Sequence, residues 1–162
     1  MKLIRLTAVL LLVATVVAAG CRKPAPVSTA AAKPPKHEHK PPHGGTPVVL
    51  GDEVYHVELV LDAATGKLQA FVFDGELENF IRSSALTVEI DAVVNGQPKI
   101  IVLSAVANPA TGETVGDTSL FEGQADWLKG VKDFDATLKA ITVRGTTFSE
   151  VQFNFPKGND KD

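Results

Sequence analysis

Cysteine, methionine, tryptophan and tyrosine each occur only once in this sequence of 162 residues. The single cysteine, Cys21, has no second cysteine with which to form an intramolecular disulfide. After residue 20, no apolar run is long and uninterrupted enough to cross a bilayer. The sequence also contains none of the Gly-x-Gly-x-x-Gly, Walker, Cys-x-x-Cys or Gly-x-Ser-x-Gly motifs that mark common enzyme classes. We therefore expect that this protein is not an enzyme.

Positive charge is scarce in most of the chain, although the formal net charge is only −3. Residues 22–44 contain five basic side chains and one acidic side chain, whereas residues 45–162 contain nine basic and 18 acidic side chains. An acidic surface repels the phosphate backbone of nucleic acids, which basic side chains have to neutralise for binding. The sequence therefore argues against nucleic acid as a partner and divides the chain into a basic segment and an acidic module.

The first 20 residues have the composition of a secretory signal peptide. Lys2 and Arg5 precede an uncharged, mostly apolar run at 6–20 that ends in small residues. As a helix, these 15 residues would span ~22 Å, which is less than the ~30 Å hydrocarbon core of a bilayer. The pattern predicts a signal peptide over residues 1–20, with a permanent membrane anchor as the alternative.

The end of this segment, Ala18-Ala19-Gly20-Cys21, resembles a bacterial lipobox. The resemblance implies that the mature chain begins with a lipid-modified Cys21; an unmodified thiol is the alternative. Several acyl chains would hold the protein on the membrane, since one chain alone binds only marginally. We therefore expect a membrane-anchored lipoprotein of the bacterial cell envelope that faces the periplasm. The residue after Cys21 is Arg22 and not an aspartate. By resemblance to enterobacterial sorting, this permits transfer of the lipoprotein to the outer membrane.

Residues 21–44 are rich in proline, lysine and histidine, and six prolines follow Cys21. Proline fixes φ and removes hydrogen-bond donors, and the lysine side chains repel one another. Such a segment cannot bury enough apolar surface to offset the entropy that it would lose on ordering. We therefore expect a lipidated Cys21 followed by a disordered tether up to residue 44, with a reach of up to ~70 Å.

All four histidines of the chain lie within twenty residues, at positions 37, 39, 43 and 56. Imidazole is a good ligand for Cu(II), Ni(II) and Zn(II), and nearby carboxylates can complete the coordination set. In an extended chain His37 and His39 point the same way, so both can approach one ion. The PHGG sequence at 42–45 resembles the copper-binding core of the prion octarepeat. The sequence therefore predicts metal binding by His37, His39 and His43, with polar filler or a proton-sensitive tether as the alternatives.

Residues 45–156 consist of short β-rich runs separated by turn residues, at spacings typical of an antiparallel sandwich. Asn95-Gly96 is a strong hairpin signal, because both turn positions need a positive φ. The apolar spacing at 125–134 indicates one or two helical turns. We expect an all-β antiparallel sandwich of seven or eight strands with one short helical segment, followed by a disordered polar tail at 157–162. The expected strands are 46–50, 54–61, 68–74, 86–94, 99–106, 118–122, 138–144 and 147–155.

His56 and Glu58 belong to the expected strand at 54–61, on its more polar face. Because they are two residues apart in a strand, their side chains point to the same side of the sheet. A short hairpin separates this strand from His43, so the two imidazoles can come together. His43, His56 and Glu58 therefore form a candidate metal site. The alternative is an outward-facing His56 on a solvated sheet face.

Four short motifs occur in order along the module: HGG at 43–45, VFDG at 72–75, LTVEI at 86–90 and LKG at 128–130. Together with Phe134 they resemble the small N-terminal β domain of periplasmic adaptors of heavy-metal efflux pumps, and stand-alone "HGG" lipoproteins even more closely. The resemblance implies metal handling in the cell envelope, with His43 as a ligand and a metal-efflux or envelope protein as partner. This chain lacks the helical hairpin and lipoyl-like parts of an adaptor, so we expect metal binding or delivery rather than pump coupling. A structural or protein-interaction lipoprotein without metal is the alternative.

Overall fold

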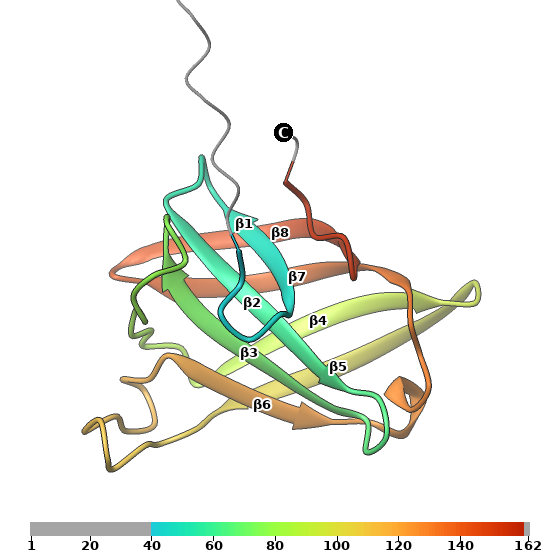
Figure 1. Ribbon diagram of the computed structural model, residues 1–162, viewed down its shortest axis with the longest axis horizontal. Coiled ribbons are helices and arrows are strands. Elements are labelled where there is room, and N and C mark those ends of the chain that lie inside the picture. The colour runs from blue at the N-terminus through green and yellow to red at the C-terminus, as the bar shows by residue number, and fades with distance from the viewer. Residues whose placement is uncertain (1–39, 161–162) are drawn as a thin grey trace, which may run out of the picture. The chain divides into compact units, whose positions relative to one another are not determined.

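The computed structural model describes residues 40–160, which form a β domain with one short helical turn (Figure 1). In chain order, its elements are the strands β1 (Thr46–Leu50), β2 (Tyr55–Asp62), β3 (Lys67–Asp74), β4 (Thr87–Val94), β5 (Gln97–Ala105) and β6 (Leu120–Gln124), the 3₁₀ helix η1 (Asp126–Leu128), and the strands β7 (Phe134–Val143) and β8 (Thr146–Phe155). The predicted all-β class, with eight antiparallel strands and one short helical segment, is therefore confirmed.

All eight strands belong to one antiparallel sheet, in the order β1-β2-β3-β6-β5-β4-β7-β8. In Figure 1, β1, β2 and β3 lie in front of β7, β8 and β4, and the two groups of strands cross. The sheet thus folds over itself into two packed layers, as in a sandwich. Its two end strands, β1 and β8, come into contact, so the sheet is nearly closed.

Buried side chains alternate with more exposed ones along β4, which explains why these residues form a strand with one buried face. Ile90 and Ala92 are buried between the layers, while the side chains between and beside them are exposed or half-buried. The turn that follows consists of Asn95 and Gly96, whose φ angles are 50° and 74°. These angles suit the tight turn that joins β4 to β5, so the predicted hairpin is confirmed.

The hydrophobic core lies between the two layers and takes side chains from the front and back strands. Complete burial of each large aliphatic or aromatic side chain favours folding by ~1.5–3 kcal/mol. This packing fixes the positions of the strands that carry the polar groups described below. The large apolar core side chains with the least exposure are Leu50, Leu59, Leu68, Ile90, Leu103, Phe121, Leu128, Leu138 and Ile141.

The residues after β8 cover the outer edge of β1. Asn154 and Gly158 exchange two backbone hydrogen bonds of 3.0 and 2.7 Å, which turn the chain back toward β1. There the side-chain amide of Asn159 accepts from the N–H of Val49 at 2.7 Å and donates to the carbonyl of Val49 at 3.2 Å. This amide takes the place of a neighbouring strand at an edge that would otherwise be open to aggregation. Residues 157–160 therefore pack against the domain, in the stretch where the sequence predicted a disordered tail over 157–162.

Residues 1–39 and 161–162 lie outside the described part of the chain. The predicted signal peptide 1–20, the lipidated Cys21, the tether up to residue 39, and His37 and His39 fall in that region. Within residues 40–160, no helix is long and apolar enough to span a membrane.

Replacement of Asn159 with alanine removes both hydrogen bonds at the edge of β1. Because a typical hydrogen bond contributes ~1 kcal/mol net, we expect the free energy of unfolding to fall by ~1–2 kcal/mol in urea denaturation. Lys157→Ala is the matched control, since Lys157 is exposed in the same segment, and it should change the free energy by less than ~0.5 kcal/mol. Equal losses in the two variants would contradict the role given to the Asn159 amide.

Candidate functional site

The segment before β1 folds back over the outer face of β2. The N–H of Gly44 donates to the carbonyl of Pro41 at 3.0 Å, and Gly44 has a φ of 68°, which glycine adopts without strain. Figure 1 shows this loop crossing in front of β2 before the chain enters β1. Residues 40–44 are therefore part of the folded domain, whereas the sequence predicted a disordered tether up to residue 44.

The carboxylate of Glu58 holds this loop on the sheet. Glu58 lies on the outer face of β2, yet its side chain has no exposed surface. Its Oε1 accepts hydrogen bonds of 2.8 Å from the backbone N–H groups of both His43 and Gly45. Its Oε2 lies 2.7 Å from Nδ1 of His43. A buried carboxylate is costly unless it is paired and hydrogen-bonded, and these three contacts meet that requirement.

Gly45 allows the loop to approach β2 this closely. A Cβ atom at position 45 would lie 2.5 Å from the backbone oxygen of Leu59 and 2.9 Å from side-chain atoms of Glu58 and Val60. Only glycine leaves room for the backbone N–H of residue 45 to reach the Glu58 carboxylate. At Gly44, by contrast, a Cβ would meet no atom within 4 Å. The two glycines of the HGG motif thus serve different purposes: one permits a turn and the other permits close packing.

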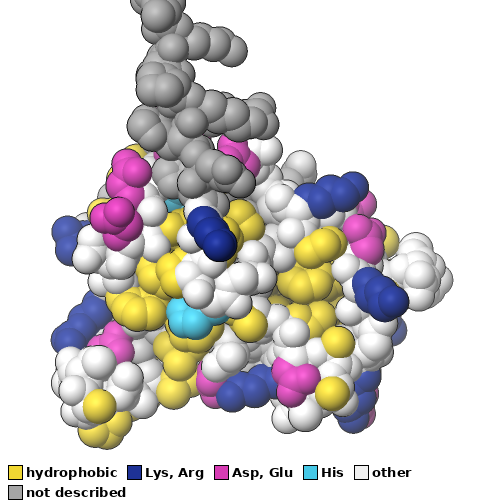
Figure 2. Space-filling view, in the orientation of Figure 1, with side chains coloured by type: hydrophobic (Ala, Val, Ile, Leu, Met, Phe, Trp, Pro, Cys, Tyr) yellow, Lys and Arg dark blue, Asp and Glu magenta, His cyan; other side chains and the backbone are white. Residues whose placement is uncertain are grey.

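The imidazole of His43 lies on a group of aromatic rings from β3 and the loop after it. It stacks on Phe71 at a centroid distance of 4.1 Å and an interplanar angle of 15°. The centroids of Phe73 and Phe80 are each 6.1 Å from the imidazole centroid, and these two rings stack on each other. The His43 side chain remains 36% exposed. Figure 2 shows histidine at the surface of this face, surrounded by hydrophobic side chains.

The pairing with Glu58 determines which nitrogen of His43 is available to a ligand. An ionised carboxylate only accepts hydrogen bonds, so the short contact with Oε2 requires a proton on Nδ1 of His43. In a neutral imidazole the lone pair is then on Nε2. The fold therefore presents His43 as a half-exposed imidazole with a fixed tautomer, which suits a metal ligand.

His56 does not lie on a solvated face, which corrects one of the two alternatives from the sequence. It is only 1% exposed, and its Nδ1 lies 3.3 Å from the backbone oxygen of Asp74. The structure brings His43 and Glu58 into direct contact, and it places the His56 ring against the end of β3. Within residues 40–160, no three His, Cys, Asp or Glu side chains gather closely enough to hold a metal ion.

Asp74 organises the turn that carries Phe80. Its carboxylate accepts hydrogen bonds from the N–H groups of Glu78 and Asn79 and from the side-chain amide of Asn79. Burial acts to raise the pKa of Asp74, but the hydrogen bonds from Asn79 and Glu78 outweigh it, so the pKa is lowered. The turn thereby presents Phe80, of which 54% is exposed, beside Phe73.

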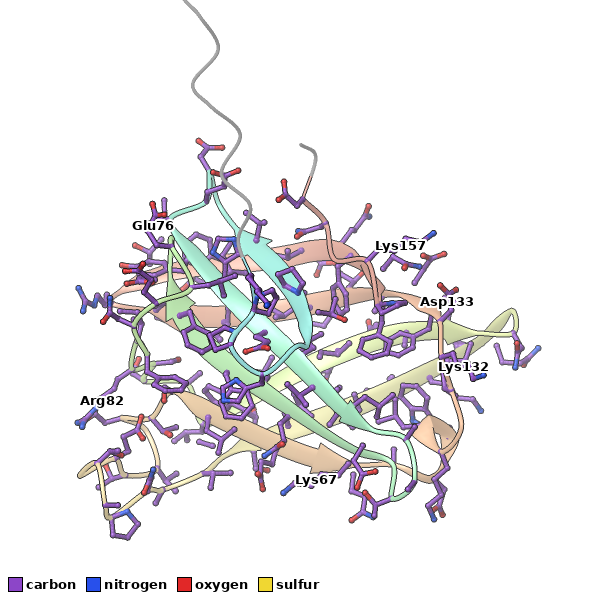
Figure 3. All side chains as sticks on the ribbon, in the orientation of Figure 1. Lys67, Glu76, Arg82, Lys132, Asp133 and Lys157 are labelled. Atoms are coloured by element: carbon purple, nitrogen blue, oxygen red, sulfur yellow. The ribbon has the colours of Figure 1, made fainter. Side chains whose placement is uncertain are left out.

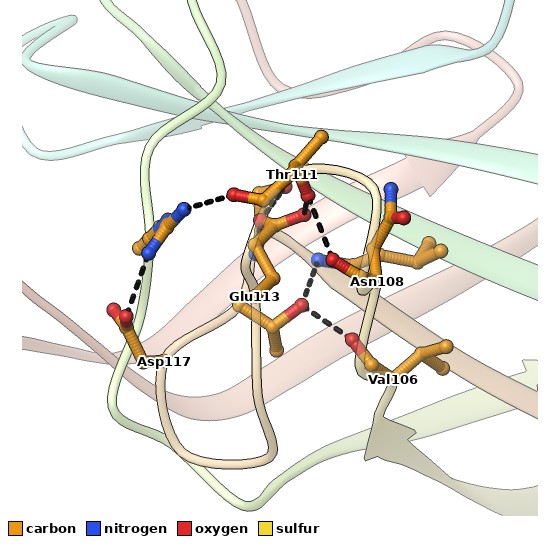
Figure 4. A network of polar contacts seen from close by, with 9 residues as sticks. Val106, Asn108, Thr111, Glu113 and Asp117 are labelled. Atoms are coloured by element: carbon orange, nitrogen blue, oxygen red, sulfur yellow. Dashed lines mark hydrogen bonds and ion pairs between the residues drawn. The ribbon is translucent and has the colours of Figure 1, made fainter.

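A second polar cluster, which sequence reasoning did not single out, lies between the loops before β4 and before β6 (Figure 4). Oε1 of Glu113 accepts from the N–H and hydroxyl of Ser119 at 2.8 and 2.7 Å, and its Oε2 accepts from the hydroxyl of Thr111 at 2.7 Å. Arg82 donates to Asp117 at 2.8 Å and to the carbonyl of Thr111 at 2.6 Å. The only sequence signal was a polar stretch at 107–118 without hydrophobic periodicity, which indicates no more than a loop.

The electrostatics of this cluster favour an ionised Glu113. Burial is the largest influence and acts to raise the pKa of Glu113. The hydrogen bonds from Thr111 and Ser119, together with the charge of Arg82, act in the opposite direction and prevail, so the pKa is lowered. In Figure 3, Arg82 and other charged side chains such as Lys67 and Lys157 lie around the rim of the domain and point outward.

Comparison with family models, curated proteins and solved structures finds no match to this chain.

Gly45→Ala tests the close approach of the loop to β2. The added Cβ would collide with Leu59 and Glu58, so the loop has to leave the carboxylate, and we expect a loss of at least ~2 kcal/mol in the free energy of unfolding. Gly44→Ala is the control: it meets no neighbour and costs only the ~1 kcal/mol of a left-handed alanine. A larger loss for Gly44→Ala than for Gly45→Ala in urea denaturation would contradict this account of the motif.

Glu113→Gln tests the second cluster through its pH dependence. Because the folded-state pKa of Glu113 is lowered from 4.5, its ionised form stabilises the fold above that pH, and this contribution disappears as the pH falls. We expect the wild type to be more stable than the variant at pH 7, with a difference that shrinks steadily below about pH 4.5. Denaturant titrations from pH 7 to acid pH would measure it. A constant difference across that range would refute the assignment.

Proposed function

We propose that this protein is a lipoprotein of the bacterial cell envelope that binds a divalent transition metal ion, Cu(II), Ni(II) or Zn(II). His43 is the ligand from the folded domain, and His37 and His39 from the preceding segment complete the site. The observation that carries the proposal is the 2.7 Å contact between Nδ1 of His43 and the buried Oε2 of Glu58.

Glu58 is a positioning residue in this proposal and not a ligand. Metal-binding histidines usually donate their second ring N–H to a carboxylate or carbonyl, which fixes the tautomer and raises the basicity of the imidazole. Glu58 fits the role of the carboxylate that positions such a histidine, because it is fully buried and both of its oxygens accept hydrogen bonds from the loop. The metal ion would bind Nε2 of His43, on a side chain that remains 36% exposed.

The remaining histidines differ in what they can contribute. His37 and His39 precede His43 by six and four residues, so a short extended stretch of chain brings both imidazoles within reach of an ion at Nε2. His56 is 1% exposed and contacts the backbone of Asp74, so we assign it a structural role under the loop. A bound metal ion would supply a cross-link between the tether and the domain, since three imidazoles suit all three candidate ions.

The location follows from the N-terminal part of the sequence. A signal peptide at 1–20 and a lipid on Cys21 would place the domain in the periplasm, at the end of a spacer attached to the membrane. In that position, a metal site at the junction of the tether and the domain suits the capture or delivery of metal ions. A metal-efflux or other envelope protein would then be the partner, and no catalytic step is involved.

Glu58→Gln and His43→Ala test the proposal by isothermal titration calorimetry with Cu(II), Ni(II) and Zn(II). In Glu58→Gln the amide oxygen still accepts from the N–H groups of His43 and Gly45, so the amide NH₂ faces Nδ1 of His43. The proton of the imidazole then has to move to Nε2, which removes the lone pair that the metal needs. We expect a loss of metal affinity of about 10–100-fold in Glu58→Gln, and at least as much in His43→Ala.

The full-length chain in detergent is used throughout, and thermal unfolding confirms that each variant is folded. Glu53→Gln is the matched control, because Glu53 is an exposed carboxylate in the loop after β1, and it should bind metal as the wild type does. Loss of binding in His37→Ala, His39→Ala would assign the other ligands. Unchanged affinity in both Glu58→Gln and His43→Ala would overturn the proposal and favour the alternative, a structural or protein-interaction lipoprotein.

A further inference from the structure

A pocket of about 280 Å³ lies between the aromatic group under His43 and the Glu113 cluster. Its lining includes Phe71, Phe80 and Leu120 on one side, and Arg82, Asn108 and Glu113 on the other. Pockets for small molecules typically have volumes of ~300–1,000 Å³ and combine apolar walls with a few oriented polar groups. This pocket is slightly smaller than that range, so it would take a ligand with a single ring.

The apolar side of the pocket offers aromatic faces. Phe71 and Phe80 are inclined at 46° with centroids 6.2 Å apart, so their planes form an angled wall. Phe80 is supported from behind by its stacking on Phe73 at 4.6 Å, although 54% of its surface is exposed. An exposed aromatic ring that neighbours hold in place can stack against a flat apolar surface of a ligand.

The polar side of the pocket has fixed groups with unused hydrogen-bonding capacity. A carboxylate has about four lone-pair sites, of which Glu113 uses three for Ser119 and Thr111. Arg82 makes two hydrogen bonds, to Asp117 and Thr111, and retains further N–H groups. Asn108 uses its side-chain oxygen to accept from the N–H of Ala110, which leaves its NH₂ as a donor. The pocket therefore offers donors and an acceptor whose positions are set before a ligand arrives.

The charges around the pocket exclude an anion as the ligand. Arg82 is paired with Asp117 at 2.8 Å, and Glu113 adds a second negative charge that the lowered pKa keeps ionised. One positive and two negative side chains repel phosphates, sulfates and carboxylates. A ligand with mixed donors and acceptors, no charge and one apolar face meets these conditions best. The ring of a sugar has this chemistry, because its C–H groups form a flat apolar face and its hydroxyl groups both donate and accept.

We infer that this pocket binds a single ring of an uncharged saccharide, whose C–H face stacks on Phe80 while its hydroxyl groups bond to Glu113, Arg82 and Asn108. The site is separate from the His43–Glu58 pair, and a saccharide would bind without a metal ion. The two sites share the rings of Phe71 and Phe80, which lie beside the His43 imidazole and also line the pocket.

The test is a titration of the ¹⁵N-labelled full-length chain, monitored by NMR, in a detergent without a sugar head group. The probes are methyl glucoside and N-acetylglucosamine, with choline as a cationic and inorganic phosphate as an anionic comparison. We expect saturable shifts at millimolar saccharide in the amides of Thr111, Glu113 and Ser119, and no such shifts with the two ions. Saturation by choline or phosphate, or the absence of shifts at high millimolar saccharide, would overturn the inference.

Variants test whether the saccharide stacks on the ring of Phe80 or only makes apolar contact with it. They also test whether a loss of binding results from misfolding. Phe80→Leu keeps an apolar side chain but removes the ring face, and we expect it to weaken saccharide binding about tenfold. Asn108→Ala removes an exposed donor, together with the acceptor of the Ala110 N–H, and should weaken binding several-fold while the amide signals outside residues 107–114 keep their positions. Val115→Ala is the control, because Val115 is exposed in the same loop but does not line the pocket. Wild-type affinity in both Phe80→Leu and Asn108→Ala would contradict the proposed contacts.

Discussion

The arrangement of the candidate site depends on one buried carboxylate on the outer face of β2. Glu58 has no exposed surface and accepts hydrogen bonds from two backbone N–H groups and from the imidazole of His43. Without these donors the burial of its charge would cost several kcal/mol, so the loop and the carboxylate have to stay together. This constraint places His43 on Phe71 and holds residues 43–45 at a defined point on the sheet.

Two further polar side chains on loops hold parts of the fold together by hydrogen bonds. The amide of Asn159 covers the edge of β1, and the carboxylate of Glu113 joins the loop before β6 to the start of that strand. In each case a single side chain satisfies several backbone or hydroxyl groups that a regular strand would satisfy with its neighbours. Loops held in this way can present Phe80 and Arg82 in fixed positions, and both candidate binding sites lie beside such loops.

Sequence periodicity predicted much of the sheet but little of the site. The alternation of residues 87–94 and the Asn95-Gly96 turn are local features, so the hairpin could be predicted without a structure. His56 was placed on a polar strand face, and either a metal site or a solvated position was expected. It is buried, and its Nδ1 lies 3.3 Å from the backbone oxygen of Asp74 at the end of β3. The periodicity of one strand cannot predict such burial, because the burial depends on contacts with other segments of the chain.

Local features of the sequence were enough to predict the all-β class and the hairpin, and they showed the concentration of histidines near the start of the domain. These properties depend on side-chain alternation, on turn residues that tolerate positive φ and on composition, all of which are local. Three contacts could be seen only in the folded protein: Glu58 pairs with His43, Asn159 covers the edge of β1, and Glu113 and Arg82 line the same pocket. These contacts join residues that are distant in the chain, and they form because a buried polar group has to find a partner wherever the fold brings one within reach.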